Sequence, residues 1–131
     1  MTTRLLTLLA ALAVSAVSLV AAPAPDITGK WTTAFETQVG TMNLTFDFAV
    51  KEGKVTGTIV GKNDQLGEMK SVIKNGKVDG EAVSFTEDLD IMGMTISIDY
   101  KGKIGSADEI KFTRTVGEFA TEEFVAKRVK S

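Results

Sequence analysis

The stretch Ile27-Thr28-Gly29-Lys30-Trp31-Thr32-Thr33-Ala34-Phe35 decides the fold of this chain. It holds the only tryptophan of the sequence, and from Trp31 onward the odd positions carry the large apolar residues Trp31, Phe35 and Val39. Side chains two residues apart in a β-strand point to the same face of the sheet. The stretch therefore predicts a β-strand with one buried face.

Residues 1–24, which precede the predicted domain, have the pattern of a secretory signal peptide. Arg4 supplies a positive charge, residues 5–20 are almost wholly apolar, and Ala21-Ala22-Pro23-Ala24 provides small residues for cleavage. A membrane anchor is the alternative, but this apolar run is short for a transmembrane span and no basic cluster follows it. We therefore expect a signal peptide at 1–24 and one exported domain at 25–131, secreted or periplasmic.

The composition of the expected domain excludes several classes of partner. Removal of residues 1–24 takes away Arg4, so 14 of the 15 basic residues remain against 17 acidic ones and the net charge is −3. A weakly acidic surface of mixed charge predicts no nucleic acid partner and no membrane association after cleavage. The chain has no cysteine, so no disulfide restrains it and an apolar core must hold it. The oligomeric state is left open.

The two-residue alternation continues along the whole expected domain. The even positions from Met42 to Val50 are all apolar, and similar segments follow as far as Val129. Turn signals separate these segments at Glu52-Gly53, Asp79-Gly80 and Met92-Gly93. Eight strands joined by short turns predict an all-β, eight-stranded antiparallel up-and-down barrel. A two-sheet sandwich is the alternative.

One of the predicted strands contains an irregularity at Asn75-Gly76. The strand is expected from Glu68 to about Asp79, and its apolar phase moves from Met69 and Ile73 to Val78. A change of phase inside a strand predicts a β-bulge. A two-residue hairpin turn at Asn75-Gly76 is the alternative.

The opening Thr28-Gly29-Lys30-Trp31 resembles the first strand of lipocalins and avidins, which are eight-stranded barrels of the calycin type. With its turns Gly53-Lys54-Val55 and Gly76-Lys77-Val78, the chain as a whole resembles small secreted bacterial lipocalin-like domains, some of which are fused to carbohydrate-active enzymes. The resemblance implies a lipocalin-like barrel. It does not imply a biotin site, because avidin-type sites use several tryptophans.

The resemblance also implies structural roles for three residues at one end of the barrel. Trp31, which follows Gly29 closely, is expected to close the barrel floor beside an arginine from a late strand. Arg114 and Arg128 are the two candidates for that arginine. If Trp31 closes one end, any ligand site lies at the other end.

The residue types that are absent exclude most catalytic machinery. The chain has no histidine and no cysteine, so it has no Ser-His or Cys-His pair and no typical zinc or copper site. No phosphate-binding loop or dinucleotide-binding glycine motif is present. We therefore expect no catalytic residue, no metal site and no cofactor, and we favour a protein that is not an enzyme.

Polar residues in the inward phase of the strands are the best candidates for binding a ligand. These residues are Thr33, Thr37, Glu87, Tyr100 and Arg114. A charge that points inward is costly unless it is paired, so Glu87 and Arg114 should meet each other, a water or a ligand. The alternative is a purely structural pair, or an arginine that packs over Trp31.

The sequence thus favours an exported barrel that binds a small molecule or a glycan. One alternative is a carbohydrate-active protein that uses carboxylates, which would need a second inward carboxylate within ~5–10 Å of Glu87. Another is a purely structural or interaction domain with a filled interior. A binding barrel should have a cavity above ~300 Å³ with convergent polar groups. Met69, Met92 and Met94 are candidates for an apolar rim, with plain packing as the alternative.

Overall fold

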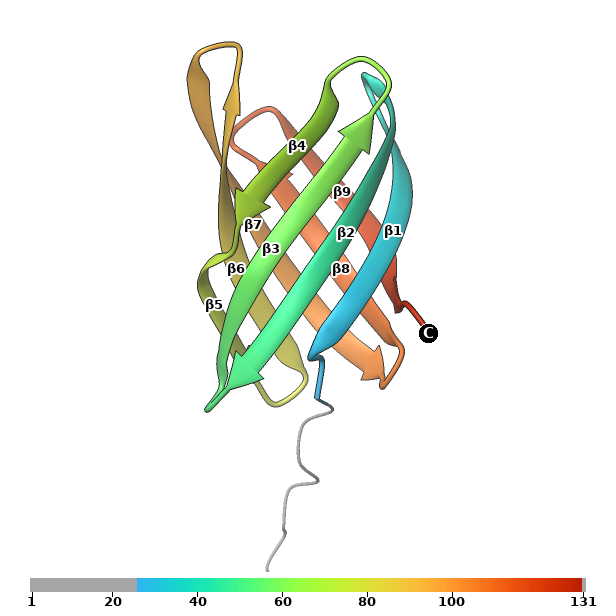
Figure 1. Cartoon of the computed structure of the whole chain (residues 1–131), viewed down its shortest axis with the longest axis vertical. Coiled ribbons are helices and arrows are strands. Elements are labelled where there is room, and N and C mark those ends of the chain that lie inside the picture. Colours follow the sequence, from blue (N-terminus) through green and yellow to red (C-terminus); the bar gives the residue numbers. More distant parts are fainter. Residues whose placement is uncertain (1–25, 131) are drawn as a thin grey trace, which may run out of the picture.

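The computed structural model describes residues 26–130, and the expected signal peptide at 1–24 lies outside the described residues. The described chain is all-β and forms one closed antiparallel barrel (Figure 1). Its strand segments are β1 (Gly29–Thr37), β2 (Gly40–Lys51), β3 (Lys54–Asn63), β4 (Gly67–Val72), β5 (Lys74–Asp79), β6 (Ala82–Ile91), β7 (Met94–Ser106), β8 (Glu109–Val116) and β9 (Ala120–Arg128). Because β4 and β5 both pair with β3 and form one interrupted strand, the predicted eight-stranded barrel is confirmed.

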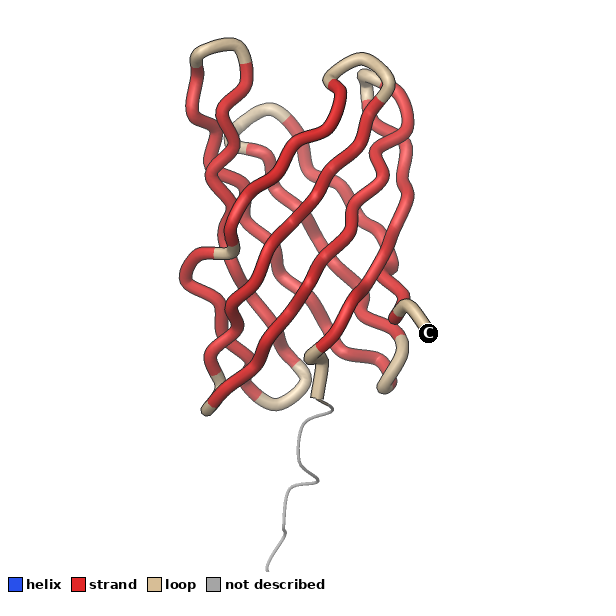
Figure 2. The backbone as a smooth tube through the Cα atoms, viewed as in Figure 1, coloured by secondary structure: helices blue, strands red, loops and turns tan. Residues whose placement is uncertain are grey.

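The strands follow one another around the barrel in an up-and-down order. Each strand pairs with its neighbours in the chain, and β9 returns to pair with β1. The connecting turns therefore gather at the two ends of the barrel (Figure 2). We call the end with the β1–β2, β3–β4, β6–β7 and β8–β9 turns the mouth, and the opposite end, where residue 26 lies, the base. No helix in residues 26–130 is long and apolar enough to cross a membrane.

Two of the predicted turns have the backbone geometry that tight β-hairpins require. Glu52 and Gly53 have φ angles of 53° and 78°, and Met92 and Gly93 have φ angles of 52° and 80°. Positive φ at both central residues defines a type I′ turn, whose twist matches that of the flanking strands. These turns join β2 to β3 at the base and β6 to β7 at the mouth.

The irregularity at Asn75-Gly76 is a bulge, and the alternative of a hairpin turn is wrong. The register of β5 against β6 shifts between Lys74 and Lys77, and Asn75 has a positive φ of 52°. The chain does not fold back at this point. It continues along β3, where Gly76 lies opposite Val55, so the extra residue is absorbed within one strand.

Large side chains fill the base and the middle of the barrel. Trp31 is fully buried at the base. In the middle, the ring of Phe46 lies between 5.4 and 6.3 Å from the rings of five other aromatic residues, measured between centroids. These five are Phe48, Phe85, Tyr100, Phe112 and Phe124. Within the described residues, the aromatic core therefore leaves the mouth as the part of the barrel interior where a ligand could enter.

Backbone pairing closes the barrel at the base but not at the mouth. The pairs that join β1 to β9 are Trp31↔Arg128 and Thr32↔Lys127, both near the base. On the other side, within residues 26–130, β5 pairs with β6 but no ladder joins β4 to β6. Towards the mouth the barrel therefore divides into two half-sheets, β4-β3-β2-β1 and β6-β7-β8-β9. The predicted barrel is nevertheless the observed fold and the sandwich alternative is wrong, because all strands belong to one sheet and β9 pairs with β1.

Candidate functional site

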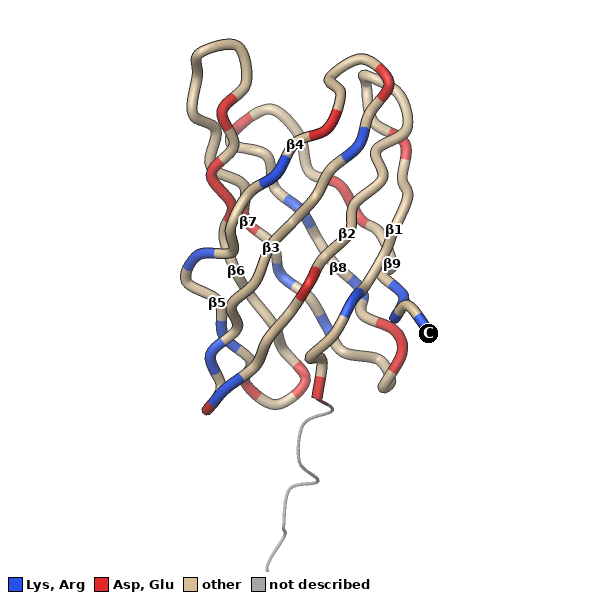
Figure 3. Tube along the Cα trace, viewed as in Figure 1, with Lys and Arg blue, Asp and Glu red and all other residues tan. Residues whose placement is uncertain are grey.

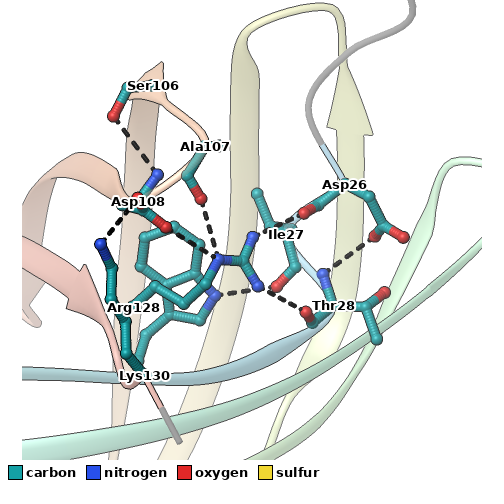
Figure 4. Close-up of polar contacts among 9 residues, drawn as sticks. Asp26, Ile27, Thr28, Ser106, Ala107, Asp108, Arg128 and Lys130 are labelled. Atoms are coloured by element: carbon teal, nitrogen blue, oxygen red, sulfur yellow. Dashed lines mark hydrogen bonds and ion pairs between the residues drawn. The ribbon is translucent and has the colours of Figure 1, made fainter.

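Arg128 on β9 packs over Trp31 and closes the base (Figure 4). Its guanidinium carbon lies 4.6 Å from the centroid of the Trp31 ring. The same group donates hydrogen bonds to the backbone oxygens of Thr28 and Asp26 at 2.7 Å and of Ala107 at 2.9 Å. Of the two candidate arginines, Arg128 thus occupies this position and Arg114 does not.

Gly29 leaves the room that Arg128 needs. Its φ angle of 130° lies in a region that residues with a side chain rarely adopt, and an added Cβ would lie 3.0 Å from Nη1 of Arg128. The indole N–H of Trp31 is also satisfied, because it donates to the Ile27 oxygen at 2.8 Å. These contacts use the indole N–H of Trp31 and all three guanidinium nitrogens of Arg128, and so hold the base together.

An apolar cavity of about 120 Å³ lies at the mouth between the two half-sheets. It is lined by Thr37, Val39, Met42, Leu66, Met69, Leu89, Ile91, Ile98, Arg114, Val116, Ala120 and Glu122. Many of these side chains are only half-buried, so the cavity opens to solvent. It is smaller than the ~300 Å³ that we expected of a site for a drug-sized ligand. The cavity therefore suits a small ligand, or one group of a larger ligand.

A chain of hydrogen bonds forms the polar floor of this cavity. The hydroxyl of Tyr100 donates to Oε1 of Glu87 at 2.8 Å and accepts from Nε of Arg114 at 3.0 Å. Nη1 of Arg114 then pairs with Oε2 of Glu122 at 3.0 Å, and the Ser71 hydroxyl donates to Oε2 of Glu87. Glu87 and Arg114 thus meet through Tyr100. We call these five residues the floor network.

The charge states within the floor network follow from burial and from neighbouring charges. Burial raises the pKa of the Tyr100 hydroxyl well above its usual range, and the nearby Glu87 raises it further. Tyr100 therefore stays neutral and can donate its proton to Glu87. Burial by itself lowers the pKa of Arg114, but Tyr100, Glu122 and Glu87 outweigh that effect and raise it. The guanidinium consequently stays charged.

Thr33 and Thr37 lie outside the floor network. The Thr33 hydroxyl donates to the Val125 oxygen at 2.8 Å and so bridges β1 and β9 just where their backbone pairing ends. The Thr37 side chain lines the cavity, but its hydroxyl donates to Gly40 and accepts from the Val39 N–H within the β1–β2 turn. Among the predicted site residues, the structure brings together Glu87, Tyr100 and Arg114.

Sequence reasoning missed Glu122 and Ser71, although both obey the strand alternation. Glu122 shares its phase on β9 with the buried Phe124 and Ala126, and Ser71 shares its phase with Met69 and Ile73. Reading the inward phase of the last strand as carefully as that of β8 would have found Glu122. Ser71 gives a weaker signal, because a half-buried serine in a strand is common.

The three candidate rim methionines have different positions. Met69 lines the cavity, whereas Met92 is 94% exposed and Met94 is 58% exposed at the tip of the β6–β7 hairpin. The hairpin projects beyond the mouth (Figure 1). The pair of β7 and β8 nearest the mouth is Ile98↔Val116, and β7 extends beyond this pair to Met94. Strand alternation alone would place Met94 on the same face as the buried Ile98 and Tyr100, but Met94 is exposed because it lies on this projecting hairpin.

The arrangement can hold an apolar group against aliphatic walls, with a polar end at Arg114 and Glu122. Among the described residues, no three His, Cys, Asp or Glu side chains are grouped to hold a metal ion. Comparisons of the chain with protein-family models, curated proteins and solved structures find no match. The resemblance to calycin-type domains accordingly stays a prediction.

Proposed function

We propose that the protein is an exported, lipocalin-like barrel that binds a small ligand in the mouth cavity. The observation that carries the proposal is the apolar cavity with Arg114 and Glu122 at its floor. Small-molecule sites commonly combine an apolar lining with a few placed polar groups. The signal pattern at residues 1–24 and the opening at residues 27–35 support secretion and the calycin type.

The dimensions of the cavity define the kind of ligand. A dry, apolar cavity of ~150 Å³ is large enough to bind benzene, so 120 Å³ suits a group of about four or five heavy atoms. Larger ligands would need the half-sheets to move apart. Such a movement would break side-chain contacts where the two half-sheets meet, such as the hydrogen bond from Thr33 to the Val125 oxygen. It would break no backbone hydrogen bonds between β4 and β6, because these two strands are not paired.

The lining favours an apolar ligand over a glycan. No aromatic ring lines the cavity, and its polar side chains are Thr37, Arg114 and Glu122. A sugar carries many hydroxyls, and each one that is buried without a partner costs free energy. An aliphatic group does not carry that cost, and burying it contributes roughly 0.8 kcal/mol per methylene.

The lining also disfavours a glycosidase that uses two carboxylates. Such an enzyme needs both acids to face one substrate. Glu122 lines the cavity, whereas Glu87 is 4% exposed, is not among the lining residues and is already bonded to Tyr100 and Ser71. A barrel without any ligand remains the alternative that an experiment must exclude.

Methyl NMR on the methionines tests the proposal, because they report on two different places. Met42 and Met69 line the cavity, and Met92 and Met94 lie on the projecting hairpin. Titration with butan-1-ol should shift the first pair saturably, with a Kd on the order of 1–10 mM for so small a ligand. The resonances of Met92 and Met94 should stay in place.

A cavity-filling variant provides the control. Ala120→Phe places a ring in the cavity and should abolish the saturable shifts. Thr121→Phe, which adds the same ring to the exposed outer face of the same strand, should leave them intact. The proposal fails if butan-1-ol produces no saturable shift at Met42 and Met69, or if Ala120→Phe binds as the unmodified protein does.

A further inference from the structure

The floor network carries more negative than positive charge. Glu87 and Glu122 contribute two carboxylates, Arg114 contributes one guanidinium, and the hydroxyls of Tyr100 and Ser71 are neutral. Arg114 pairs with Glu122, so the carboxylate that has no cation of its own is Glu87, which does not line the cavity. The network as a whole is therefore negative, and a cationic ligand beside Glu122 would reduce this uncompensated charge.

Glu122 is the member of the network that a ligand can reach most easily. Its side chain is 16% exposed, against 5% for Arg114, and both line the cavity. Oε2 of Glu122 accepts from Arg114, while no hydrogen bond among residues 26–130 uses Oε1. No side-chain oxygen of the described residues is both buried and without a partner, so Oε1 of Glu122 is accessible to solvent.

The surroundings of the mouth have the same sign. Acidic residues near the mouth turns outnumber lysines, as Figure 3 shows for the upper end of the barrel. The acidic residues are Glu36, Asp64, Glu68, Asp88, Asp90 and Glu118, and the lysines are Lys62, Lys70 and Lys74, the last of which pairs with Asp88 at 2.6 Å. Lys70 is itself paired with Glu68 at 3.7 Å. A negative potential around a cleft raises the local concentration of cations.

We infer that the mouth cavity takes a primary alkylammonium with a short, unbranched apolar stem, an inference that rests on the proposed function. The stem lies among aliphatic side chains such as Met42 and Met69, and the ammonium donates to Oε1 of Glu122. An anionic head would instead meet the carboxylate of Glu122. Arg114 already uses Nε and Nη1 in hydrogen bonds, so only its Nη2 would remain for such a head. A free alkylamine and a lysine side chain of a partner polypeptide share this chemistry.

Three probes of similar length test the inference through the methyl resonances of Met42 and Met69, and n-butylammonium and butan-1-ol are isosteric. We expect n-butylammonium to bind at least ~10-fold more tightly than butan-1-ol, because a hydrogen bond to a charged group contributes that much. Butyrate should bind most weakly. Glu122→Gln keeps the shape of the side chain and should bring the ratio of the two Kd values for n-butylammonium and butan-1-ol close to one. Glu123→Gln, on the exposed outer face of β9, should keep the ratio unchanged.

A salt titration tests the preference for a cationic ligand without the need for a variant. Raising the NaCl concentration to ~1 M shortens the screening length to ~3 Å and should weaken n-butylammonium binding while leaving butan-1-ol binding unchanged. Equal affinities for n-butylammonium and butan-1-ol, or tightest binding of butyrate, would overturn the preference for a cation but leave binding at the mouth intact. Binding of none of the three probes would overturn both the inference and the proposed function.

A lysine derivative distinguishes the two sources of the ligand. If Nα-acetyl-lysine-N-methylamide binds as tightly as n-butylammonium, the cavity accepts a lysine side chain whose backbone stays at the mouth. If it binds more than ~10-fold more weakly, by about 1.4 kcal/mol, the cavity selects a free amine. Either result supports the alkylammonium chemistry, provided that n-butylammonium itself binds.

Discussion

Replacing Tyr100 with phenylalanine removes one hydroxyl from the centre of the floor network and should strongly destabilise the barrel. The ring keeps its place, because its contacts with Phe46 and Phe85 involve only ring carbons. The hydroxyl, however, joins Glu87 to Arg114, and both of these residues are only 4% exposed. Tyr100→Phe therefore leaves one oxygen of Glu87 and one N–H of Arg114 without their partner.

The expected loss is large for a change of one atom. A hydrogen bond to a charged group contributes about 1.5–3 kcal/mol, and two such bonds are lost, so the free energy of unfolding should fall by ~3–6 kcal/mol. Thr95→Val is the matched control, because it also removes a hydroxyl that donates to a carboxylate, that of Asp90 at 2.6 Å, but on the exposed surface. It should cost less than ~1 kcal/mol.

Urea unfolding followed by the fluorescence of the single tryptophan measures both variants. Trp31 lies at the base, away from the mouth, so its fluorescence reports on global unfolding rather than on the substitution. A loss below ~1 kcal/mol for Tyr100→Phe would refute the reasoning. It would mean that water replaces the hydroxyl at little cost and that the floor is wetter than its burial indicates.

The remaining predictions concern pH, the base and the hairpin. The raised pKa of Tyr100 contributes stability that is complete below the unfolded pKa of 10.0 and is lost above it. Between pH 10 and 11 the free energy of unfolding of the unmodified protein should thus fall by up to about 1.4 kcal/mol per pH unit more than that of Tyr100→Phe. The phenolate absorbance of this single tyrosine should appear only on unfolding. Arg128→Met removes three hydrogen bonds and the contact with Trp31, and should lower the free energy of unfolding by ~2–4 kcal/mol in urea titrations; a loss below ~0.5 kcal/mol would contradict a sealed base. Gly29→Ala should cost roughly 1–3 kcal/mol because φ is 130° there, and an unchanged midpoint would show that the backbone relaxes freely. Met92→Ser should change stability by less than ~0.5 kcal/mol, since the side chain is 94% exposed, and a larger loss in the same titration would place Met92 in a contact that the fold does not contain.

Most of the fold follows from the sequence because its signals are local. The two-residue alternation places apolar residues on one face, and turn pairs such as Met92-Gly93 end the strands where positive φ is needed. The same alternation points Glu87, Tyr100 and Arg114 inward, which is why these three predicted site residues do meet. Trp31 is buried at the base, a position that the resemblance to calycin-type domains implies and that no local pattern predicts.

The split of the barrel towards the mouth is not contained in any local pattern. It depends on the register between β1 and β9, which pair at Trp31 and Thr32 but not further along, and on the break between β4 and β5. Strand alternation says which face a residue occupies but not where two distant strands part. Thr37 and Glu122 both line the cavity, but strand alternation does not show that the Thr37 hydroxyl is already used by its own turn.

The volume of the cavity also escapes sequence reasoning. It is what remains after Met42, Met69 and Leu89 have packed from opposite half-sheets, and small shifts of such side chains decide whether the space is open or filled. The expected cavity above ~300 Å³ was a general property of binding sites. The observed value of about 120 Å³ is particular to these side chains.

A crystal structure of the protein grown with butan-1-ol tests binding at the mouth most directly. Electron density for one alcohol molecule is expected between Met42, Met69 and Val116, at the opening between the two half-sheets. An empty cavity at saturating alcohol, or density only at other places on the barrel, would contradict a ligand site at the mouth.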